Sequence, residues 1–291
     1  MRARLIGADR PTSAGRLCLP CGRKPVLPLP DDPTYLQIGD RSASESVILQ
    51  EKVSMSTKHQ KVAIITGASQ GIGAALVQGY RKLGYGIVAT SRSIAPADDA
   101  DVLTVQGDIA APATAERVVT AALERFGRID TVGNNAGIFV AKPFTDYTAE
   151  DYATVTGINM AGFFHLTRQA LPHLLARGAG HIVSVTTSLV DSPDSRVPSV
   201  LASLTKGGLQ SATKSLAIEY ATRGIRVNAV SPGTIKTPMH PEETHEFLAA
   251  LHPVGRMGEA SDIVDAVLFL ETAPFVTGEM LHVDGGMSAG H

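Results

Sequence analysis

The chain has 291 residues, of which 44% are hydrophobic and 19% charged, which is enough for one large α/β domain or two small ones. A formal net charge of −2 gives no electrostatic reason to expect nucleic acid or an anionic membrane as a partner, and no apolar run approaches the length of a membrane span. The two cysteines, Cys18 and Cys21, lack the two further ligands of a structural zinc site, so we expect no metal.

Residues 1–55 differ in composition from the rest of the chain. Six of the 17 prolines fall there, and the first part is rich in arginine, a bias shared with organellar transit peptides. No continuous amphipathic helix accompanies that bias, so organellar targeting by residues 1–30 is the weaker alternative. We expect residues 1–55 to be a disordered leader or a non-native extension, with Met55 as a candidate start and a cytoplasmic location for the domain.

From Lys61 onward, apolar strand-like runs alternate with helical segments, which is the pattern of a parallel sheet covered on both faces. The predicted strands cover residues 61–66, 86–91, 102–107, 129–134, 181–186, 225–230 and 279–283. The predicted helices cover residues 71–83, 112–126, 148–177, 200–223 and 261–271. Seven parallel strands with helices between them make a doubly wound α/β fold, and we expect a single domain over residues 56–291.

Two features depart from this alternation of strands and helices. Pro172 should bend or interrupt the helix over 148–177, because proline removes one hydrogen bond and clashes with the preceding turn. The segment from Thr234 to Leu251, which carries Pro238 and Pro241, breaks the alternation late in the chain. An insertion of this kind beside a cofactor cleft is often a substrate lid, and we predict that role for it.

The first predicted strand ends in Thr66–Gly73, with the spacing Gly-x-x-x-Gly-x-Gly, and a helical pattern follows. Closely spaced glycines let the backbone approach a pyrophosphate, and the helix behind them directs free N–H groups and a positive dipole end at the anion. An ordinary glycine turn is the alternative, but the strand before it and the helix after it favour a phosphate site. The residues expected to bind the cofactor here are Gly67, Ser69, Gln70, Gly71, Ile72 and Gly73.

The ends of the second and third predicted strands carry the residues that would recognise the adenosine half of a dinucleotide. An acid after the second strand would bind the ribose 2′-OH of NAD, whereas arginine accommodates the 2′-phosphate of NADP. Arg92 stands there without an acid, so NADP is favoured over NAD, unless Arg92 is only a solvated surface cation. Asp108 and Ile109 would contact the adenine, although an aspartate that caps the next helix would look the same.

A series of motifs follows the chain in a fixed order: Thr66–Gly73, Asp108-Ile109, Asn134–Gly137, Asn159, Arg226–Gly233 and Val283–Gly286. In this order they resemble the short-chain dehydrogenase/reductase family over roughly residues 60–287. The resemblance implies a Rossmann-type domain, a nicotinamide cofactor, a homotetramer or homodimer, and hydride transfer between NADP and a small carbonyl, alcohol or imine. It also implies that Asn135 lies against the cofactor and that Lys206 holds the nicotinamide ribose. Contacts to the nicotinamide end would come from Pro232, Gly233, Ile235 and Thr237.

The chemistry of the family rests on Asn, Ser, Tyr and Lys, with the last two spaced Tyr-x-x-x-Lys. Four residues apart on one helix, the two side chains share a face, so the ammonium lowers the pKa of the phenol, which protonates the carbonyl oxygen as hydride arrives. Lys206 matches the lysine, but Ala202 stands where the tyrosine is expected. Loss of a general acid typically costs about a hundred- to ten-thousandfold in rate.

The resemblance implies two further catalytic residues. Asn159 would bind a water that links Lys206 to solvent, and the alternative is a helix-bending polar residue in the core. The serine that orients the substrate is Ser188 when the position is counted back from Lys206, whereas strand alignment points to Thr187. We prefer Ser188.

Other side chains could replace the missing phenol. Ser199 shares the helical face of Ala202, but a serine hydroxyl is a far weaker acid. His240, His245 and His252, on or beside the predicted lid, titrate nearer neutrality, with surface histidines as the alternative. Reduction of an iminium or of a polarised C=C bond would place different demands on proton delivery.

The sequence is therefore consistent with two functions. The leading hypothesis is an NADP-dependent oxidoreductase with an atypical catalytic centre, in which Lys206, Asn159 and Ser188 act on a small-molecule substrate. The alternative is a dinucleotide-binding pseudoenzyme with little or no turnover, or a partner subunit of a mixed oligomer. Ala202 motivates that alternative directly.

Overall fold

A computed structural model of the protein describes residues 60–290, which form one domain around a parallel sheet of seven strands. The strand order is β3-β2-β1-β4-β5-β6-β7. The strands are β1 (Val62–Thr66), β2 (Gly86–Ser91), β3 (Val102–Gln106), β4 (Thr131–Asn134), β5 (Gly180–Val185), β6 (Ile225–Pro232) and β7 (Met280–Val283). The predicted doubly wound fold is confirmed. The expected leader and the Cys18-x-x-Cys21 pair lie outside the described residues.

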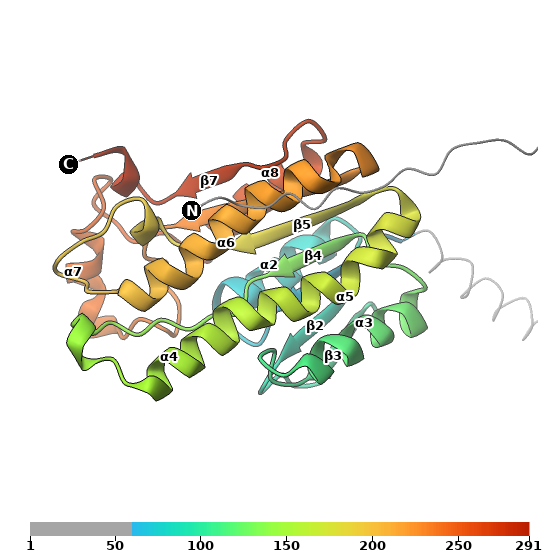
Figure 1. Ribbon diagram of the computed structural model, residues 1–291, viewed down its shortest axis with the longest axis horizontal. Coiled ribbons are helices and arrows are strands. Elements are labelled where there is room, and N and C mark those ends of the chain that lie inside the picture. Colours follow the sequence, from blue (N-terminus) through green and yellow to red (C-terminus); the bar gives the residue numbers. More distant parts are fainter. Residues whose placement is uncertain (1–59, 291) are drawn as a thin grey trace, which may run out of the picture. The chain divides into compact units, whose positions relative to one another are not determined.

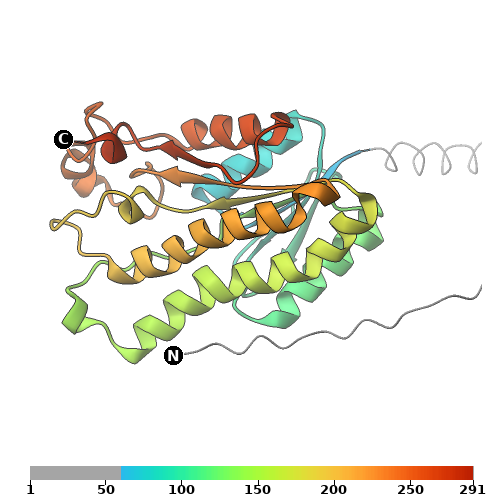
Figure 2. The ribbon, with the colours of Figure 1, turned by 45° about the horizontal axis from the view of Figure 1, so that its top comes forward.

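Helices cover both faces of the sheet (Figures 1 and 2). One face packs against α2 (Gly71–Lys82) and α8 (Ala260–Thr272), and the other against α3 (Pro112–Phe126), α5 (Gly162–Arg177) and α6 (Val200–Tyr220). The two cores follow from strand alternation, because successive side chains of a strand point to opposite faces. In the fully buried β1, Val62 and Ile64 belong to one core, and Ala63 and Ile65 to the other.

The order of the strands reverses next to β1, and this reversal positions the site. From β1 the chain winds outward through β2 to β3, then crosses back to β4 on the other side of β1 and continues outward to β7. In open parallel sheets of this kind, ligands bind in the crevice at the carboxyl ends of the strands on either side of the reversal. The glycine turn follows β1 and the Asn135–Ile138 segment follows β4, so both border this crevice.

The long helix expected over 148–177 is divided at a different place from the one predicted. It consists of α4 (Ala149–Thr156), a π-helical segment η2 (Gly157–Ala161) and α5. Pro172 lies inside α5, which continues through it, so the expectation of an interruption there is wrong. Burial of Leu166, Ala170 and Leu174 against the core stabilises α5 on both sides of the proline, which offsets the one hydrogen bond that Pro172 cannot donate.

A buried carboxylate joins elements at the amino ends of the strands, opposite the crevice. Glu271 of α8 accepts hydrogen bonds from the hydroxyls of Tyr80, Tyr85 and Thr131, at 3.1, 2.9 and 3.0 Å, and lies 2.8 Å from His181 Nδ1. Burial opposes ionisation of Glu271, but the hydrogen bonds, led by that from His181, lower its pKa to about 2. Burial lowers the pKa of His181, so the imidazole stays neutral and donates from Nδ1. This cluster fixes α8 and α2 to the sheet.

Candidate active site

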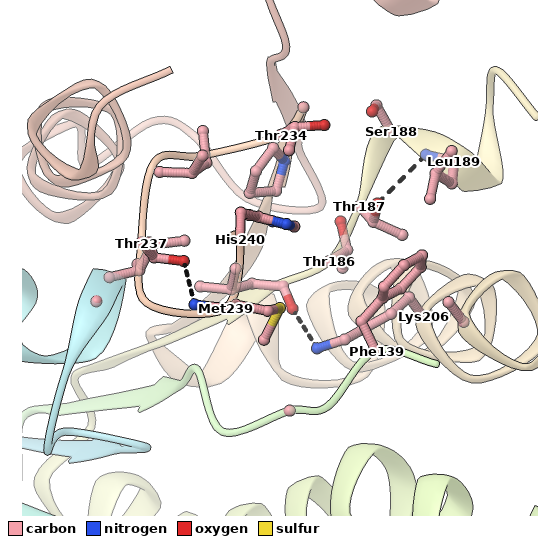
Figure 3. Close-up of a pocket in the computed structure, with 18 of the residues that line it drawn as sticks. Phe139, Thr186, Thr187, Ser188, Leu189, Lys206, Thr234, Thr237, Met239 and His240 are labelled. Carbon is pink, nitrogen blue, oxygen red and sulfur yellow. Dashed lines mark hydrogen bonds between the residues drawn. The ribbon is translucent and has the colours of Figure 1, made fainter. Parts of the chain in front are cut away.

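A cavity of about 260 Å³ lies at the carboxyl ends of the strands, and we call it the central pocket. Its walls are the glycine turn, the segment after β4, the turn after β5, the first half of α6 and the loop after β6. Most of its lining is apolar and includes Ile138, Phe139, Leu189, Val197, Met239, Leu248, Leu251 and Met287. Each of these walls also contributes polar residues to the lining, and several of them are drawn in Figure 3.

The glycine turn is shaped so that the backbone can approach a ligand. A Cβ at Gly73 would lie 2.1 Å from the Gly67 carbonyl oxygen and 2.6 Å from Asn135 Nδ2, so no side chain fits there. Gly67 and Gly71 have φ values of 65° and 55°, in the left-handed region that favours glycine. The first turn of α2 has no side-chain cap and no acidic residue. Its N–H groups and positive dipole end therefore suit an anionic group in the pocket.

Asn135 and Thr66 join the two strand ends that flank the crevice. Asn135 Nδ2 donates to the carbonyl oxygens of Thr66 at 2.9 Å and Gly67 at 3.3 Å. Thr66 Oγ1 accepts from the backbone N–H groups of Asn135 and Ala136 at 3.0 and 2.9 Å, and donates to the Gly133 carbonyl. Asn135, which was expected against the cofactor, lines the pocket and also holds the glycine turn in place.

Lys206 brings a cation into the centre of the pocket. Its residue is only 8% exposed, and Nζ donates to the Val185 carbonyl oxygen at 2.8 Å (Figure 3). A Cβ at position 137 would lie 2.9 Å from Nζ, so Gly137 makes room for the ammonium. Burial lowers the pKa of Lys206 to about 8, and no carboxylate within the described chain lies within ion-pair distance of it.

Ala202 and Lys206 share a face of α6, as their spacing predicts, and both line the pocket. No tyrosine of residues 60–290 lines it. The family's phenol position is therefore occupied by a methyl group, and the pocket extends over it. Ser199 precedes α6 and does not line the pocket, so it has no position from which to replace the phenol.

Asn159 lies in the π-helical segment, where it is buried. Its Oδ1 accepts from Ile138 N at 2.9 Å, and its Nδ2 donates to Ile138 O at 3.1 Å and to Thr205 Oγ1 at 3.2 Å. Asn159 does not line the pocket. Its side chain instead holds the Gly137–Ile138 backbone against α6, next to Lys206.

Thr187 and Ser188, the two candidates for the substrate-orienting hydroxyl, both line the pocket but face different surroundings. The Thr187 hydroxyl accepts from Leu189 N at 3.3 Å, where it begins the short helix η3 (Ser188–Val190). The Ser188 hydroxyl is buried and lies 3.8 Å from Met287 Sδ. In Figure 3, Ser188 lies on the side of the turn away from Lys206. This arrangement favours Thr187 over the preferred Ser188.

The loop after β6, the predicted lid, lines the pocket and contains η5 (Glu242–Thr244) and α7 (His245–Ala249). Its three histidines have different surroundings. His240 lines the pocket, and His245 Nε2 lies 3.0 Å from the His240 carbonyl oxygen. His252 is buried, accepts from Thr234 N at 2.9 Å and donates from Nδ1 to Leu248 O at 2.9 Å. The interpretation of His252 as a surface residue is wrong, and both its nitrogens are occupied.

The other expected cofactor residues divide into two groups. Pro232, Gly233, Ile235 and Thr237 line the pocket together with Gln70, Gly71 and Ile72, whereas Ser69, Arg92, Asp108 and Ile109 do not. Asp108 is exposed, and its Oδ1 accepts from Ala110 N within its own turn, so it does not cap α3. Ile109 is buried against Gly162, where it supports the floor below the crevice.

Arg92 follows β2, whose register with β1 pairs Thr90 with Thr66 at the start of the glycine turn. Its side chain is exposed, and its guanidinium makes no hydrogen bond or ion pair with the described residues. Arg92 is thus a cation without a bonding partner for its guanidinium among the described residues, and it follows the strand next to the one that ends in the glycine turn.

Sequence reasoning missed Phe139, Met239 and Met287, which supply much of the apolar lining. They come from three distant segments and lie close to residues that were found, because Phe139 is two residues after Gly137, Met239 two residues after Thr237, and Met287 directly after Gly286. The signal that could have found them is that position, because a residue that follows a motif at the carboxyl edge of the sheet faces the same crevice.

Comparison with known proteins identifies the family of the chain. The family model described as enoyl-(acyl carrier protein) reductase matches residues 67–288. A 3beta-hydroxysteroid dehydrogenase of Eggerthella lenta is 35% identical over 247 residues, which cover 78% of this chain and 94% of that protein. The solved structure of ElxO with NADP bound has a TM-score of 0.75 at 27% identity and covers 79% of this chain and all of that one.

A solved 3-ketoacyl-(acyl-carrier-protein) reductase from Brucella melitensis, complexed with NADH, has a TM-score of 0.72 at 33% identity and covers 78% of this chain and 98% of the other. These proteins are matched along nearly their whole length, and the family model spans most of the domain. The chain therefore belongs to the short-chain dehydrogenase/reductase family.

Proposed function

We propose that the protein is an NADP-dependent oxidoreductase that transfers hydride between the cofactor and an apolar carbonyl, alcohol or imine. The observation that carries the proposal is the geometry at Gly73. Because this residue has no side chain, the turn packs closely against Gly67 and Asn135, and it lines the same pocket as Lys206. A turn that no side chain can enter, followed by an uncapped helix, suits a pyrophosphate. When bound, the cofactor supplies the hydride donor or acceptor.

The residues that line the pocket, together with Arg92, fit the successive parts of the cofactor. The glycine turn would hold the pyrophosphate, Lys206 the hydroxyls of the nicotinamide ribose, and the Pro232–Thr237 segment the carboxamide end. The uncommitted Arg92 suits a 2′-phosphate and favours NADP, which is also the cofactor in the ElxO structure. The NADH in the Brucella melitensis reductase makes NAD the alternative.

The rest of the pocket indicates the kind of substrate. Phe139, Leu189, Met239 and Leu251 line the same pocket as Ala202, so an apolar substrate body would bury surface there. The hydroxyl of Thr187 or Ser188 would orient the substrate oxygen or nitrogen, and Lys206 would supply positive charge. Asn159 would act by keeping the Gly137–Ile138 backbone beside Lys206.

One experiment compares this function with the alternative of a dinucleotide-binding protein with little turnover, which Ala202 favours. The wild type, Ala202→Tyr and Lys206→Ala are screened for NADPH oxidation against aldehydes, ketones and imines. Activity of the wild type that is lost in Lys206→Ala supports the enzyme, and activity of Ala202→Tyr alone supports the alternative. Failure of both NADPH and NADH to raise the melting temperature would contradict both functions.

We also propose that the protein is a homo-oligomer. Met160, Phe164 and Leu204 expose 39, 57 and 55% of their surface on the side of η2, α5 and α6 away from the sheet, where a second copy would cover them. Sedimentation velocity tests this assembly: a dimer or tetramer is expected, and a monomer would contradict it.

No helix among residues 60–290 has the length and apolar character needed to cross a bilayer. The cytoplasmic location stays a prediction.

A further inference from the structure

We propose that His240 is the group that exchanges a proton with the substrate oxygen, in the place of the tyrosine that Ala202 replaces. This inference rests on the proposed function. The backbone of His240 is fixed on both sides, because its N–H donates to Thr237 O and its carbonyl accepts from His245 Nε2, each at 3.0 Å. Its side chain extends from the lid into the space facing Thr186 and Thr187 (Figure 3).

The imidazole of His240 makes no hydrogen bond or ion pair with the residues that the structure describes. The other two lid histidines are committed. Both ring nitrogens of His252 bond to backbone groups, and His245 bonds to the His240 carbonyl and does not line the pocket. Of these three residues, His240 alone offers its ring to a ligand.

The other polar groups of the pocket are less suited to proton transfer. Three titratable side chains line it, namely Asp194, Lys206 and His240. Asp194 accepts a bidentate ion pair from Arg196, with contacts of 2.6 to 3.0 Å. Lys206 is assigned to the ribose, and the hydroxyls of Thr187 and Ser188 are far too weak as acids. A substrate oxygen held between Thr187 and the lid would meet His240 first.

The proton and the hydride balance in both directions. In oxidation of an alcohol, the neutral imidazole would take the O–H proton as the C=O bond forms, and the bound oxidised cofactor would be the acceptor of the C–H hydride. In reduction, the imidazolium would give its proton to the carbonyl oxygen, and the bound reduced cofactor would be the source of the hydride that reaches the carbon. Burial and the neighbouring His245 lower the pKa of His240 from its ordinary value, so the neutral ring that accepts a proton prevails at pH 7.

The charges around His240 determine the sign of the expected pH dependence. From other elements it faces the ammonium of Lys206 across the pocket and the Asp194–Arg196 pair, and on the lid it faces His245. The remaining lid charges, Lys236, Glu242, Glu243 and Glu246, are exposed. Oxidation should therefore be retained at neutral pH and fall at acidic pH as the ring is protonated, whereas reduction should rise as the pH falls.

The test compares His240→Gln with Glu243→Gln, a control variant at an exposed lid residue that does not line the pocket. The probes are 1-phenylethanol with NADP⁺ and acetophenone with NADPH, assayed between pH 5 and 9. We expect His240→Gln to lower kcat at least about 100-fold and to flatten the pH profile, with the Kd for NADPH unchanged within about twofold. Glu243→Gln should keep the wild-type profile. Wild-type kcat and pH dependence in His240→Gln would overturn the role of His240.

A second readout does not depend on turnover. Diethyl pyrocarbonate modifies neutral, accessible imidazoles, and peptide mass spectrometry follows its reaction at His240. We expect the modification rate to follow a titration below the ordinary histidine pKa of about 6.5 and to fall when NADPH and acetophenone are both bound. Reaction that neither ligand slows would overturn the proposal. A wild type that binds NADPH but converts neither probe overturns it too, whereas absence of any cofactor binding contradicts the proposed function itself.

Discussion

Substitution of Gly73 by alanine tests the phosphate-binding turn directly. The added Cβ would lie 2.1 Å from the Gly67 carbonyl oxygen, which is backbone and has no flexible end that can move aside. The turn must shift, and overpacking of this kind costs about 1–3 kcal/mol of stability. Because Gly67 and Asn135 form the other sides of the same contact, the shift also moves the groups that would hold the pyrophosphate.

Gly207 provides the matched control, since it is also a helical glycine without a left-handed φ. A Cβ there would lie 3.4 Å from Val190 Cγ1, an ordinary contact. Gly207→Ala should therefore stabilise the protein by about 0.5–1 kcal/mol through helix propensity alone. Its cofactor affinity should stay that of the wild type.

The assay is urea unfolding of each protein with and without NADPH. At an NADPH concentration of about 100 times the wild-type Kd, binding should stabilise the wild type and Gly207→Ala by about 2.7 kcal/mol. A hundredfold rise in Kd would reduce that increment to about 0.4 kcal/mol, and we expect a loss of at least this size in Gly73→Ala. An undiminished increment in Gly73→Ala would refute the assignment of the turn.

Three further predictions concern single side chains. Arg92→Asp should weaken NADPH at least about tenfold relative to NADH in titrations, and equal ratios before and after would refute the assignment of the 2′-phosphate. Lys206→Met should abolish turnover yet raise the free energy of unfolding on the order of 2 kcal/mol at pH 7, because burial lowers the folded pKa to about 8. This gain in stability should shrink between pH 8 and pH 10.5, the ordinary pKa of lysine, because the folded wild type loses its buried charge in that range. A lower free energy of unfolding for Lys206→Met than for the wild type at pH 7 would contradict the prediction. Glu271→Gln should lower the free energy of unfolding at pH 7 by about 2–4 kcal/mol without altering the Kd for NADPH. The difference in stability from the wild type should diminish as the pH falls from 4.5 toward 2, because the wild-type carboxylate is then protonated. An unchanged stability at pH 7 would contradict this prediction.

Local patterns were sufficient to predict the sheet and the phosphate-binding part of the site. Each strand was an apolar run between turn residues, and β1 is buried at every position. The glycine spacing predicted a turn, and the turn formed beside Asn135 because the order of strands places β1 next to β4. The spacing of Ala202 and Lys206 placed both on the pocket face of α6, because helical periodicity alone decides that relation.

What the sequence did not predict depends on contacts between distant segments. The π-helical segment occurs where Asn159 bonds to Ile138, 21 residues earlier in the chain, and to Thr205, 46 residues later. His252 is buried because Thr234 N, 18 residues away, donates to its ring. In the same way, the distinction between Thr187 and Ser188 depends on Met287, which is 99 residues from Ser188. No local pattern in the sequence encodes these contacts.

We propose that this chain transfers hydride although alanine stands at the tyrosine position. A single-turnover reaction tests this proposal: the wild type is mixed with acetophenone and with NADPH deuterated at C4 on the transferred face, and the product is analysed by mass spectrometry. We expect 1-phenylethanol that carries one deuterium, formed by the wild type and not by Lys206→Ala. Deuterated product from Ala202→Tyr, with none from the wild type, would contradict the claim.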